Sequence, residues 1–201
     1  MFGAWQAGAW KALAPNFQPD LVVGASVGSL NGYAIAAGWS AEELCAWWLR
    51  SPIEGISHGF RDLPEMARRL VAARPLEREF AVVLVNLLRM QPRTFVGSEV
   101  TARHLVASCA LPGAYPPQRI DGSWYVDGGL LNPLPVWAAV ELGATRIVAL
   151  HALPEFPAAL LKPLVKAFRA VFGYHPALPP GVKVITLVPG VQPLGNLYDV
   201  L

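Results

Sequence analysis

The sequence DLVVGASVGSL, residues 20–30, decides the fold of this chain. Its first half is a short run of Leu and Val that predicts a buried β-strand ending at Gly24, and the apolar residues after Gly28 predict a helix. Between them, residues 24–28 fit the pattern G-x-S-x-G, in which the serine occupies a sharp strand-to-helix turn. The stretch therefore predicts an α/β fold with Ser26 as candidate nucleophile.

The turn around Ser26 suits a developing negative charge. Exposed N–H groups and the helix dipole favour an anion at the start of a helix. The N–H of Val27, the residue after the serine, is a candidate oxyanion donor. Gly24 and Gly28 leave room for a strained backbone and a substrate, so we expect both to be needed. An ordinary turn containing glycine and serine gives the same letters, and the pattern alone leaves that alternative open.

The composition is that of one apolar domain spanning residues 1–201, with 54% hydrophobic residues and seven Trp. No apolar run approaches the roughly 18 residues of a membrane span, and no signal peptide is recognisable, so we expect a cytoplasmic protein. The net charge is +2, and the sequence has no basic patch interleaved with aromatic residues. We therefore expect no nucleic-acid partner. Cys45 and Cys109 lack metal-ligand spacing; we expect free thiols, no metal and no cofactor.

Strands alternate with helices along the rest of the chain, which predicts a layered α/β domain with a largely parallel sheet. Residues 40–43 have the pattern of a helix-starting capping box. A turn is expected at Gln91 and Pro92, and a tight hairpin with its turn at Asp121 and Gly122. Further strands are expected at residues 80–88, 146–150 and 182–188, and further helices at 4–14, 63–73 and 158–172.

A serine nucleophile needs a base, and Asp127 is the main candidate. It lies between an apolar strand and the pair Gly128 and Gly129, an unusual place for a solvated charge. The glycines permit the close backbone approach that an active-site loop requires. Two alternatives stay open at this point. Asp-Gly is a frequent turn pair, and a triad of Ser26, Asp127 and His151 has the chain order of an α/β-hydrolase.

Two ordered motifs resemble the patatin-like phospholipase family. The first is GASVG after an apolar strand, at residues 24–28, and the second is YVDGGLLNPLP at residues 125–135. The segment SCALPG at 108–113, followed by two prolines, and the helix WQAGAWKAL at 5–13 are also similar to that family. The resemblance covers most of residues 1–150.

The resemblance implies a three-layer αβα fold with a mostly parallel central sheet and a serine hydrolase of phospholipids or other lipid esters. It implies a dyad without histidine, with Ser26 as nucleophile and Asp127 as the base that activates it. The four histidines then have no catalytic role: His58, His104, His151 and His175.

The chain departs from the family pattern at both ends. Members begin with a strand and a glycine-rich loop of the form G-G-G-x-x-G that supplies oxyanion donors, and here only Gly3 corresponds to it. We therefore expect a domain truncated at the N-terminus, with unpaired edges on the neighbouring strands. A final helix is expected about where the chain ends, at Leu201. A catalytically impaired or inactive homologue is the alternative that these departures favour.

Residues 158–172 predict an amphipathic helix with apolar residues on one side and Lys162, Lys166 and Arg169 on the other. Such a helix either packs on its own core or lies in a membrane interface with its cations near anionic head groups. The sequence thus leaves peripheral membrane contact through this segment open.

Overall fold

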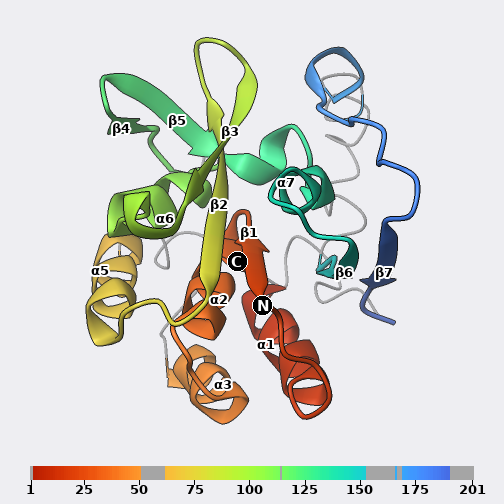
Figure 1. Cartoon of the computed structure of the whole chain (residues 1–201). Helices are drawn as coiled ribbons and strands as arrows, with labels where there is room; N and C mark the ends of the chain where they lie inside the picture. Colours follow the sequence, from red (N-terminus) through yellow and green to blue (C-terminus); the bar gives the residue numbers. More distant parts are fainter. Residues whose placement is uncertain (1, 51–61, 114, 153–165, 167–168, 191–201) are drawn as a thin grey trace.

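The computed structural model describes residues 2–50, 62–113, 115–152, 166 and 169–190. Helices surround a central β-sheet, which confirms the predicted α/β class (Figure 1). The α-helices are α1 (Phe2–Leu13), α2 (Val27–Ala36), α3 (Ala41–Arg50), α5 (Leu63–Ala73), α6 (Ala102–Ser108) and α7 (Val136–Glu141). The strands are β1 (Leu21–Gly24), β2 (Glu79–Asn86), β3 (Gln91–Val96), β4 (Gln118–Ile120), β5 (Ser123–Asp127), β6 (Arg146–Leu150) and β7 (Lys183–Leu187). Two short 3₁₀ turns complete the order, η1 (Gly97–Glu99) and η2 (Gly128–Leu130).

The sheet is mixed, with β2 at its centre. β1 and β2, with the helices α2, α3 and α5 between them in the chain, pair in parallel, and β6 and β7 pair in parallel as a separate two-stranded sheet. Hairpins contribute the antiparallel pairs, which join β2 to β3 and β4 to β5, and β5 also runs antiparallel to β2. This follows from chain geometry, because a tight turn reverses the chain and a crossover restores its direction.

The register of β2 brings the ends of two distant strands together. β3 pairs along residues 81–86, so it occupies one edge of β2, and β1 and β5 share the other edge. β1 runs parallel to β2 and ends with Gly24 opposite Val82. β5 runs the opposite way and ends with Asp127 opposite Leu84. The carboxyl ends of β1 and β5 therefore meet head to head beside Val83.

Alternate residues of β2 pack against helices on opposite faces, as the two-residue period of a strand requires. Phe80, Val82 and Leu84 belong to the large core formed with α1, α2, α3, α5 and α6. Val83 faces the other way and packs against Trp137 and Ala138 of α7. The sheet is therefore covered on both faces, which gives three layers. The residues from Phe80 to Val85 are 0–1% exposed, so β2 is the buried centre of the fold.

A groove of about 850 Å³ separates β1 from β6. Among the described residues, β1 pairs only with β2 and β6 only with β7, so each has an edge without a strand partner. The amide of Gln6 lies near Gly28, just after β1, and donates to the Leu150 carbonyl at the end of β6. The carboxyl ends of both strands therefore lie at the same edge.

Local predictions from the sequence have mixed outcomes. The capping box at the start of α3 is confirmed: Glu43 N–H donates to Ser40 Oγ at 3.1 Å, and Ser40 N–H donates to Glu43 Oε2 at 2.8 Å. The hairpin turn at Asp121 and Gly122 is also present between β4 and β5. The turn expected at Gln91–Pro92 is wrong, because the chain turns at residues 87–90 and Pro92 pairs with Val85.

Candidate active site

Ser26 lies in a strained turn between β1 and α2. Its backbone has φ 54° and ψ −138°, a conformation that residues with a side chain rarely adopt. The preceding Gly24 has no room for a Cβ, because one built there would lie 2.6 Å from the Gly28 carbonyl oxygen and within the backbone of Ser29. The turn thus aims the Ser26 side chain away from the strand and toward the end of β5.

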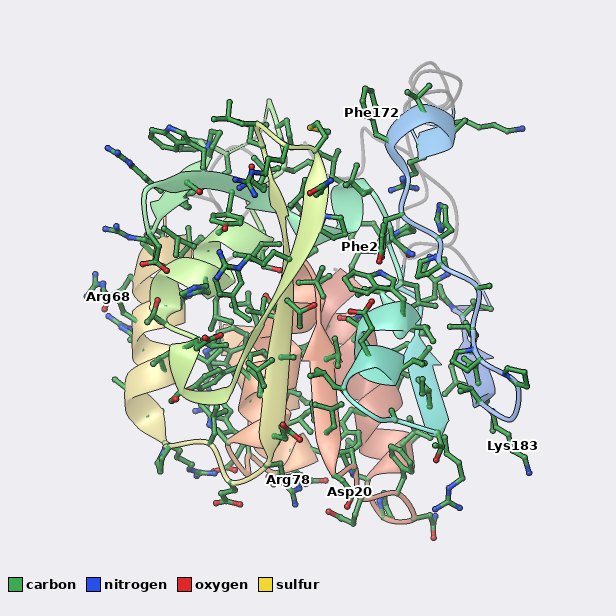
Figure 2. The ribbon with its side chains drawn as sticks, turned by 45° about the horizontal axis from the view of Figure 1, so that its top comes forward. Phe2, Asp20, Arg68, Arg78, Phe172 and Lys183 are labelled. Carbon is green, nitrogen blue, oxygen red and sulfur yellow. The ribbon has the colours of Figure 1, made fainter. Side chains whose placement is uncertain are left out.

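Asp20 and Arg78, which precede β1 and β2, lie at one edge of the molecule, opposite Phe172 (Figure 2).

Asp127 is the last residue of β5 and accepts a hydrogen bond directly from the Ser26 hydroxyl. Ser26 Oγ donates to Asp127 Oδ2 at 2.7 Å, and the Gly129 N–H donates to Asp127 Oδ1 at 2.7 Å. The Asp127 N–H donates to the Ala110 carbonyl at 3.1 Å, which fixes the backbone of the same residue. The side chain is 4% exposed. Each carboxylate oxygen therefore has a hydrogen-bond donor, and the carboxylate is buried while Ser26 is partly exposed.

Ser108 joins this turn to the central strand. It lies at the end of α6, where its Oγ accepts the Ser26 N–H at 2.9 Å and donates to the Val83 carbonyl at 3.3 Å. The Ser26 N–H is therefore occupied and supports the strained turn. Val27 begins α2, so its N–H has no acceptor inside the helix and remains a candidate oxyanion donor. The segment SCALPG resembles the family, but it predicted no role for Ser108, because the contacts of this side chain are with backbone atoms far along the chain.

Burial makes the Asp127 carboxyl a base suited to neutral pH. Desolvation raises its pKa to about 6, against the hydrogen bonds from Ser26 and Gly129 and the charge of Arg169, which all favour the ionised form. The carboxyl is consequently ionised at pH 7 but binds a proton far more readily than an exposed aspartate. This matches the demand on a general base, whose pKa works best near the working pH.

Gly128 and Gly129, which follow Asp127, are each close to neighbouring atoms, but the neighbours differ. Gly128 lies so close to β2 that a Cβ would overlap the Val83 carbonyl. Gly129 is held by the N–H that it donates to the carboxylate, and a Cβ there would lie 3.1 Å from Asp127 Oδ1. The close backbone approach expected from the sequence is therefore present, most strictly at Gly128.

The structure gives two other predicted glycines a different environment. Gly3 lies in α1, where its carbonyl accepts from Asn31 Nδ2 at 2.9 Å and a Cβ would overlap the Trp48 ring. In the structure Gly3 therefore allows α1 to pack closely against Trp48 of α3. Gly28 was expected to be sterically required, but a Cβ there would lie 3.5 Å from the Gln6 amide, an ordinary contact.

The hydroxyl of Ser26 contacts the carboxylate itself, without an imidazole between them. In a Ser-His-Asp triad the histidine separates the two groups and bonds to both. His151 follows β6, and its backbone N–H donates to Leu187. His175 is exposed, with its Nδ1 3.3 Å from Asn132 Nδ2, and His58 lies outside the described residues. The arrangement favours a dyad over the triad of Ser26, Asp127 and His151.

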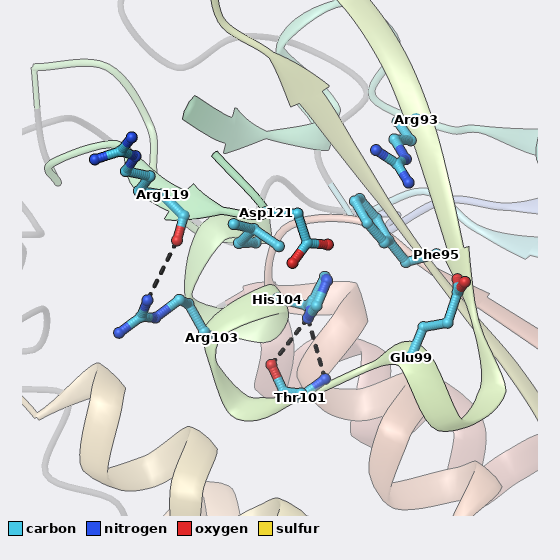
Figure 3. Close-up of a pocket in the computed structure, with 9 residues that line it drawn as sticks. Arg93, Phe95, Glu99, Thr101, Arg103, His104, Arg119 and Asp121 are labelled. Carbon is cyan, nitrogen blue, oxygen red and sulfur yellow. Dashed lines mark hydrogen bonds between the residues drawn. The ribbon is translucent and has the colours of Figure 1, made fainter. Parts of the chain in front are cut away.

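His104 has a structural role at the start of α6. The Thr101 N–H donates to its Nδ1 at 3.1 Å, so the proton of the neutral ring lies on Nε2. The residue is 6% exposed, and burial lowers its pKa. It lines a pocket of about 470 Å³ together with Arg93, Phe95 and Asp121 (Figure 3). This pocket includes neither Ser26 nor Asp127.

Arg169 contradicts one expectation about the polar side of residues 158–172. Its guanidinium is half-buried and donates to the carbonyls of Gly129 and Leu130, so it faces the Asp127 loop and not solvent. Lys166 is exposed as expected, and Lys162 lies outside the described residues. Val171 is 74% exposed although it was placed on the packed apolar side.

Within the described parts of the chain, no helix is long and apolar enough to cross a membrane. No group of three or more His, Cys, Asp or Glu side chains is arranged to hold a metal ion among those same residues. Cys109 is buried as a free thiol, and Cys45 is a free thiol with partial exposure.

A layered α/β fold with a serine at a strained strand-to-helix turn, hydrogen-bonded to a buried carboxylate, is the arrangement expected of a hydrolase that uses a serine nucleophile. The family model described as patatin-like phospholipase matches residues 1–140. The match covers more than half of the chain, so the chain belongs to the patatin-like phospholipase family, as the sequence motifs indicated. Family membership supports a lipid acyl hydrolase in general and lipids as the class of substrate. The match includes Ser26 and Asp127 and ends before Arg169.

Proposed function

We propose that this chain hydrolyses acyl ester bonds of phospholipids or related lipids through a dyad of Ser26 and Asp127. The observation that carries the proposal is the 2.7 Å hydrogen bond from Ser26 Oγ to Asp127 Oδ2 in a buried site. The pKa of about 6 supports it, because the carboxylate is ionised at neutral pH and is still basic enough to accept the serine proton.

In the first half-reaction, Ser26 Oγ attacks the ester carbonyl carbon while its proton passes to Asp127 Oδ2. The carbonyl oxygen of the resulting tetrahedral species carries the negative charge. The N–H of Val27, the residue after the nucleophile at the start of α2, is the candidate donor to that oxygen. Collapse of this species expels the alcohol oxygen, which takes the proton from Asp127. The acyl group remains bound to Ser26.

In the second half-reaction, Asp127 takes a proton from water, whose oxygen attacks the acyl carbon. The Ser26 oxygen then leaves and recovers the proton from Asp127. The fatty acid is released and the hydrogen bond of the resting dyad re-forms. Asp127 thus acts first as base and then as acid in each half-reaction.

Labelling with a fluorophosphonate tests the nucleophile without requiring a good substrate. We expect the probe to label the wild-type chain on Ser26 and not to label Ser26→Ala. Hydrolysis of a short-chain nitrophenyl ester and of phospholipid vesicles should be lost in the same variant. A folded wild-type chain that takes up no label at Ser26 would refute the proposal.

A second candidate function is that of a catalytically impaired homologue, and the groove between β1 and β6 favours it. The groove runs to Ala25 and Gly28, so an edge of β1 that has no strand partner among the described residues lies beside the Ser26 turn. Missing oxyanion donors typically cost about 10²–10³ in rate each. Labelling of Ser26 combined with ester turnover no faster than that of Ser26→Ala would favour this candidate.

We further propose peripheral contact with a lipid surface through the segment that ends at Phe172. Val171 and Phe172 are 74% and 44% exposed, and Lys166, five positions before Val171 in the chain, is also exposed. Exposed apolar side chains next to cations suit the boundary between head groups and acyl chains. This contact would place the enzyme at its substrate without a membrane-spanning segment.

A further inference from the structure

The loop that carries Asp127 is held from outside by residues late in the chain. Arg169 Nε donates to the Leu130 carbonyl at 3.2 Å, and its Nη2 donates to the Gly129 carbonyl at 3.1 Å. Asn132 Nδ2 donates to the Tyr174 carbonyl at 2.8 Å, and the Tyr174 ring packs against Trp137 of α7. The helical residues 169–172 and the residues that follow are therefore fastened to the loop by several independent contacts.

Gly129 is the residue through which this support reaches the carboxylate. Its N–H donates to Asp127 Oδ1, and its carbonyl accepts from Arg169. The guanidinium forms a planar fork, which suits the carbonyls of two successive residues better than a single ammonium would. Arg169 thus fixes the short turn η2 from the side opposite to β2, where Gly128 lies against Val83.

The charge of Arg169 acts on Asp127 as well. It favours the ionised carboxylate, and Asp127 in turn favours the charged guanidinium. Among the residues that the structure describes, the other titratable group that interacts with Asp127 is the Cys109 thiol, while Ser26 donates its hydroxyl to the carboxylate. Burial raises the pKa of Cys109, so that thiol stays neutral. Arg169 is therefore the cation that opposes the cost of burying the Asp127 charge.

We propose that Arg169 is a positioning residue for Asp127: it fixes the Gly128–Leu130 turn through the carbonyls of Gly129 and Leu130, and its charge favours the ionised carboxylate. This inference rests on the proposed function for its catalytic meaning, but its physical content is independent of turnover. Arg169 lies beyond the residues that the family model matches, so the support comes from a part of the chain that the motifs do not cover.

Three variants separate charge from geometry. Arg169→Gln removes the charge, Arg169→Lys keeps the charge but not the fork, and Lys166→Gln removes a neighbouring exposed charge as a matched control. The direct measurement is the titration of the Asp127 carboxyl carbon by NMR in ¹³C-labelled protein. It needs only a folded chain, which circular dichroism and a cooperative thermal transition verify for each variant.

We expect Arg169→Gln to raise the pKa of Asp127 by about half a unit or more, because the positive charge of Arg169 favours the ionised form. Arg169→Lys should leave that pKa near its wild-type value while the Gly129 and Leu130 amide signals shift and exchange faster. Lys166→Gln should change neither. An Asp127 pKa that is the same in Arg169→Gln and wild type would overturn the countercharge, and unchanged amides in Arg169→Lys would overturn the positioning.

Activity gives a second readout that distinguishes this inference from the proposed function. The acid limb of kcat/KM should move to higher pH in Arg169→Gln by the same amount as the Asp127 pKa. If the Asp127 pKa moves but Ser26 takes up no fluorophosphonate in any variant, the proposed function fails and the role of Arg169 toward Asp127 stands. If Arg169→Gln does not fold, Arg169→Lys and Lys166→Gln still decide the positioning through the amide signals.

Discussion

Ser26 and Asp127 are 101 positions apart in the chain, and yet the hydroxyl of one donates to the carboxylate of the other at 2.7 Å. The register of β2 accounts for this. β1 places Gly24 opposite Val82, β5 places Asp127 opposite Leu84, and both strands lie along the same edge of β2. The serine lies just beyond the end of the first strand and the aspartate is the last residue of the second. Their meeting is therefore a property of the sheet more than of either loop.

Asp127→Asn should reduce ester hydrolysis by about 10²–10⁴-fold, because an amide fills the same space but does not accept the serine proton. Turnover of the variant and of Ser26→Ala, measured side by side on the same ester, checks this. Fluorophosphonate labelling should also slow. Activity within tenfold of wild type would show that another group is the base.

The pH dependence of kcat/KM should have an acid limb near pH 6. Asp127 acts as base only when ionised, and its pKa is raised to about 6, so activity should fall about tenfold per pH unit below that value. A soluble ester avoids effects of pH on vesicles. An acid limb near pH 4, where an exposed aspartate titrates, would mean that the buried carboxyl is not the titrating group.

Asp127→Asn should also stabilise the fold at high pH. The folded-state pKa of Asp127 is about 6 against 3.8 for the ordinary group, so its stabilising contribution is present below pH 3.8 and is lost as pH rises through 6. The loss is roughly 3 kcal/mol for a shift of about two units. Denaturation at pH 8 should therefore show the variant to be more stable than wild type, whereas at pH 4 the two should nearly coincide. A variant that is less stable at pH 8 would contradict the burial cost.

Gly128→Ala should displace the Asp127 loop, because its Cβ would overlap the Val83 carbonyl. We expect a destabilisation of about 1–3 kcal/mol, as for other overpacked sites, and a loss of at least about tenfold in activity. Gly8→Ala is the control, because a Cβ there meets nothing within 4 Å and alanine favours the helix. Thermal denaturation and ester hydrolysis of both variants test the prediction. Equal behaviour of the two alanines would show that the loop has room to spare.

Val171→Ser combined with Phe172→Ser should weaken binding to phospholipid vesicles by about tenfold, because two exposed apolar side chains no longer enter the interface. Hydrolysis of a soluble ester should stay unchanged. Leu49→Ser is the control, since Leu49 is 87% exposed on α3, away from this segment. Charge reversal at Arg169 is unsuitable for this purpose, because that side chain holds the Asp127 loop. Vesicle co-sedimentation in which all three proteins bind alike would refute membrane contact through Val171 and Phe172.

The sequence indicated Ser26 and Asp127 as candidate site residues because each lies in a local pattern. Ser26 follows an apolar strand within G-x-S-x-G, and Asp127 precedes two glycines. Ser108 and Arg169 were not predictable in the same way. Ser108 accepts the backbone N–H of Ser26, and Arg169 donates to the backbone carbonyls of Gly129 and Leu130. Every residue type has these backbone groups, so no sequence pattern indicates which of them a distant side chain binds.

Glycines show the same limit. Gly24 and Gly28 occupy equivalent places in the motif, but only Gly24 is closed in by neighbouring backbone. Gly3 was assigned to an oxyanion loop by resemblance, and its neighbour in the structure is the ring of Trp48. Which glycine has no room for a side chain depends on elements that are distant in the chain. The fold class, in contrast, follows from periodicities that each segment carries by itself.

The head-to-head meeting of β1 and β5 at Val83 has a consequence for how the protein loses activity. Val82, Val83 and Leu84 are at most 1% exposed. All three pair with β3, and Val82 and Leu84 also pair with β1 and β5 on the other edge of β2, so their amides should exchange with solvent only when the whole domain opens. The positions of the Ser26 hydroxyl and the Asp127 carboxylate are fixed by the pairing of β1 and β5 with this part of β2. Local fluctuations of the surface helices should then leave the nucleophile intact. Denaturant titrations followed by Ser26 labelling and by tryptophan fluorescence should give a single shared transition.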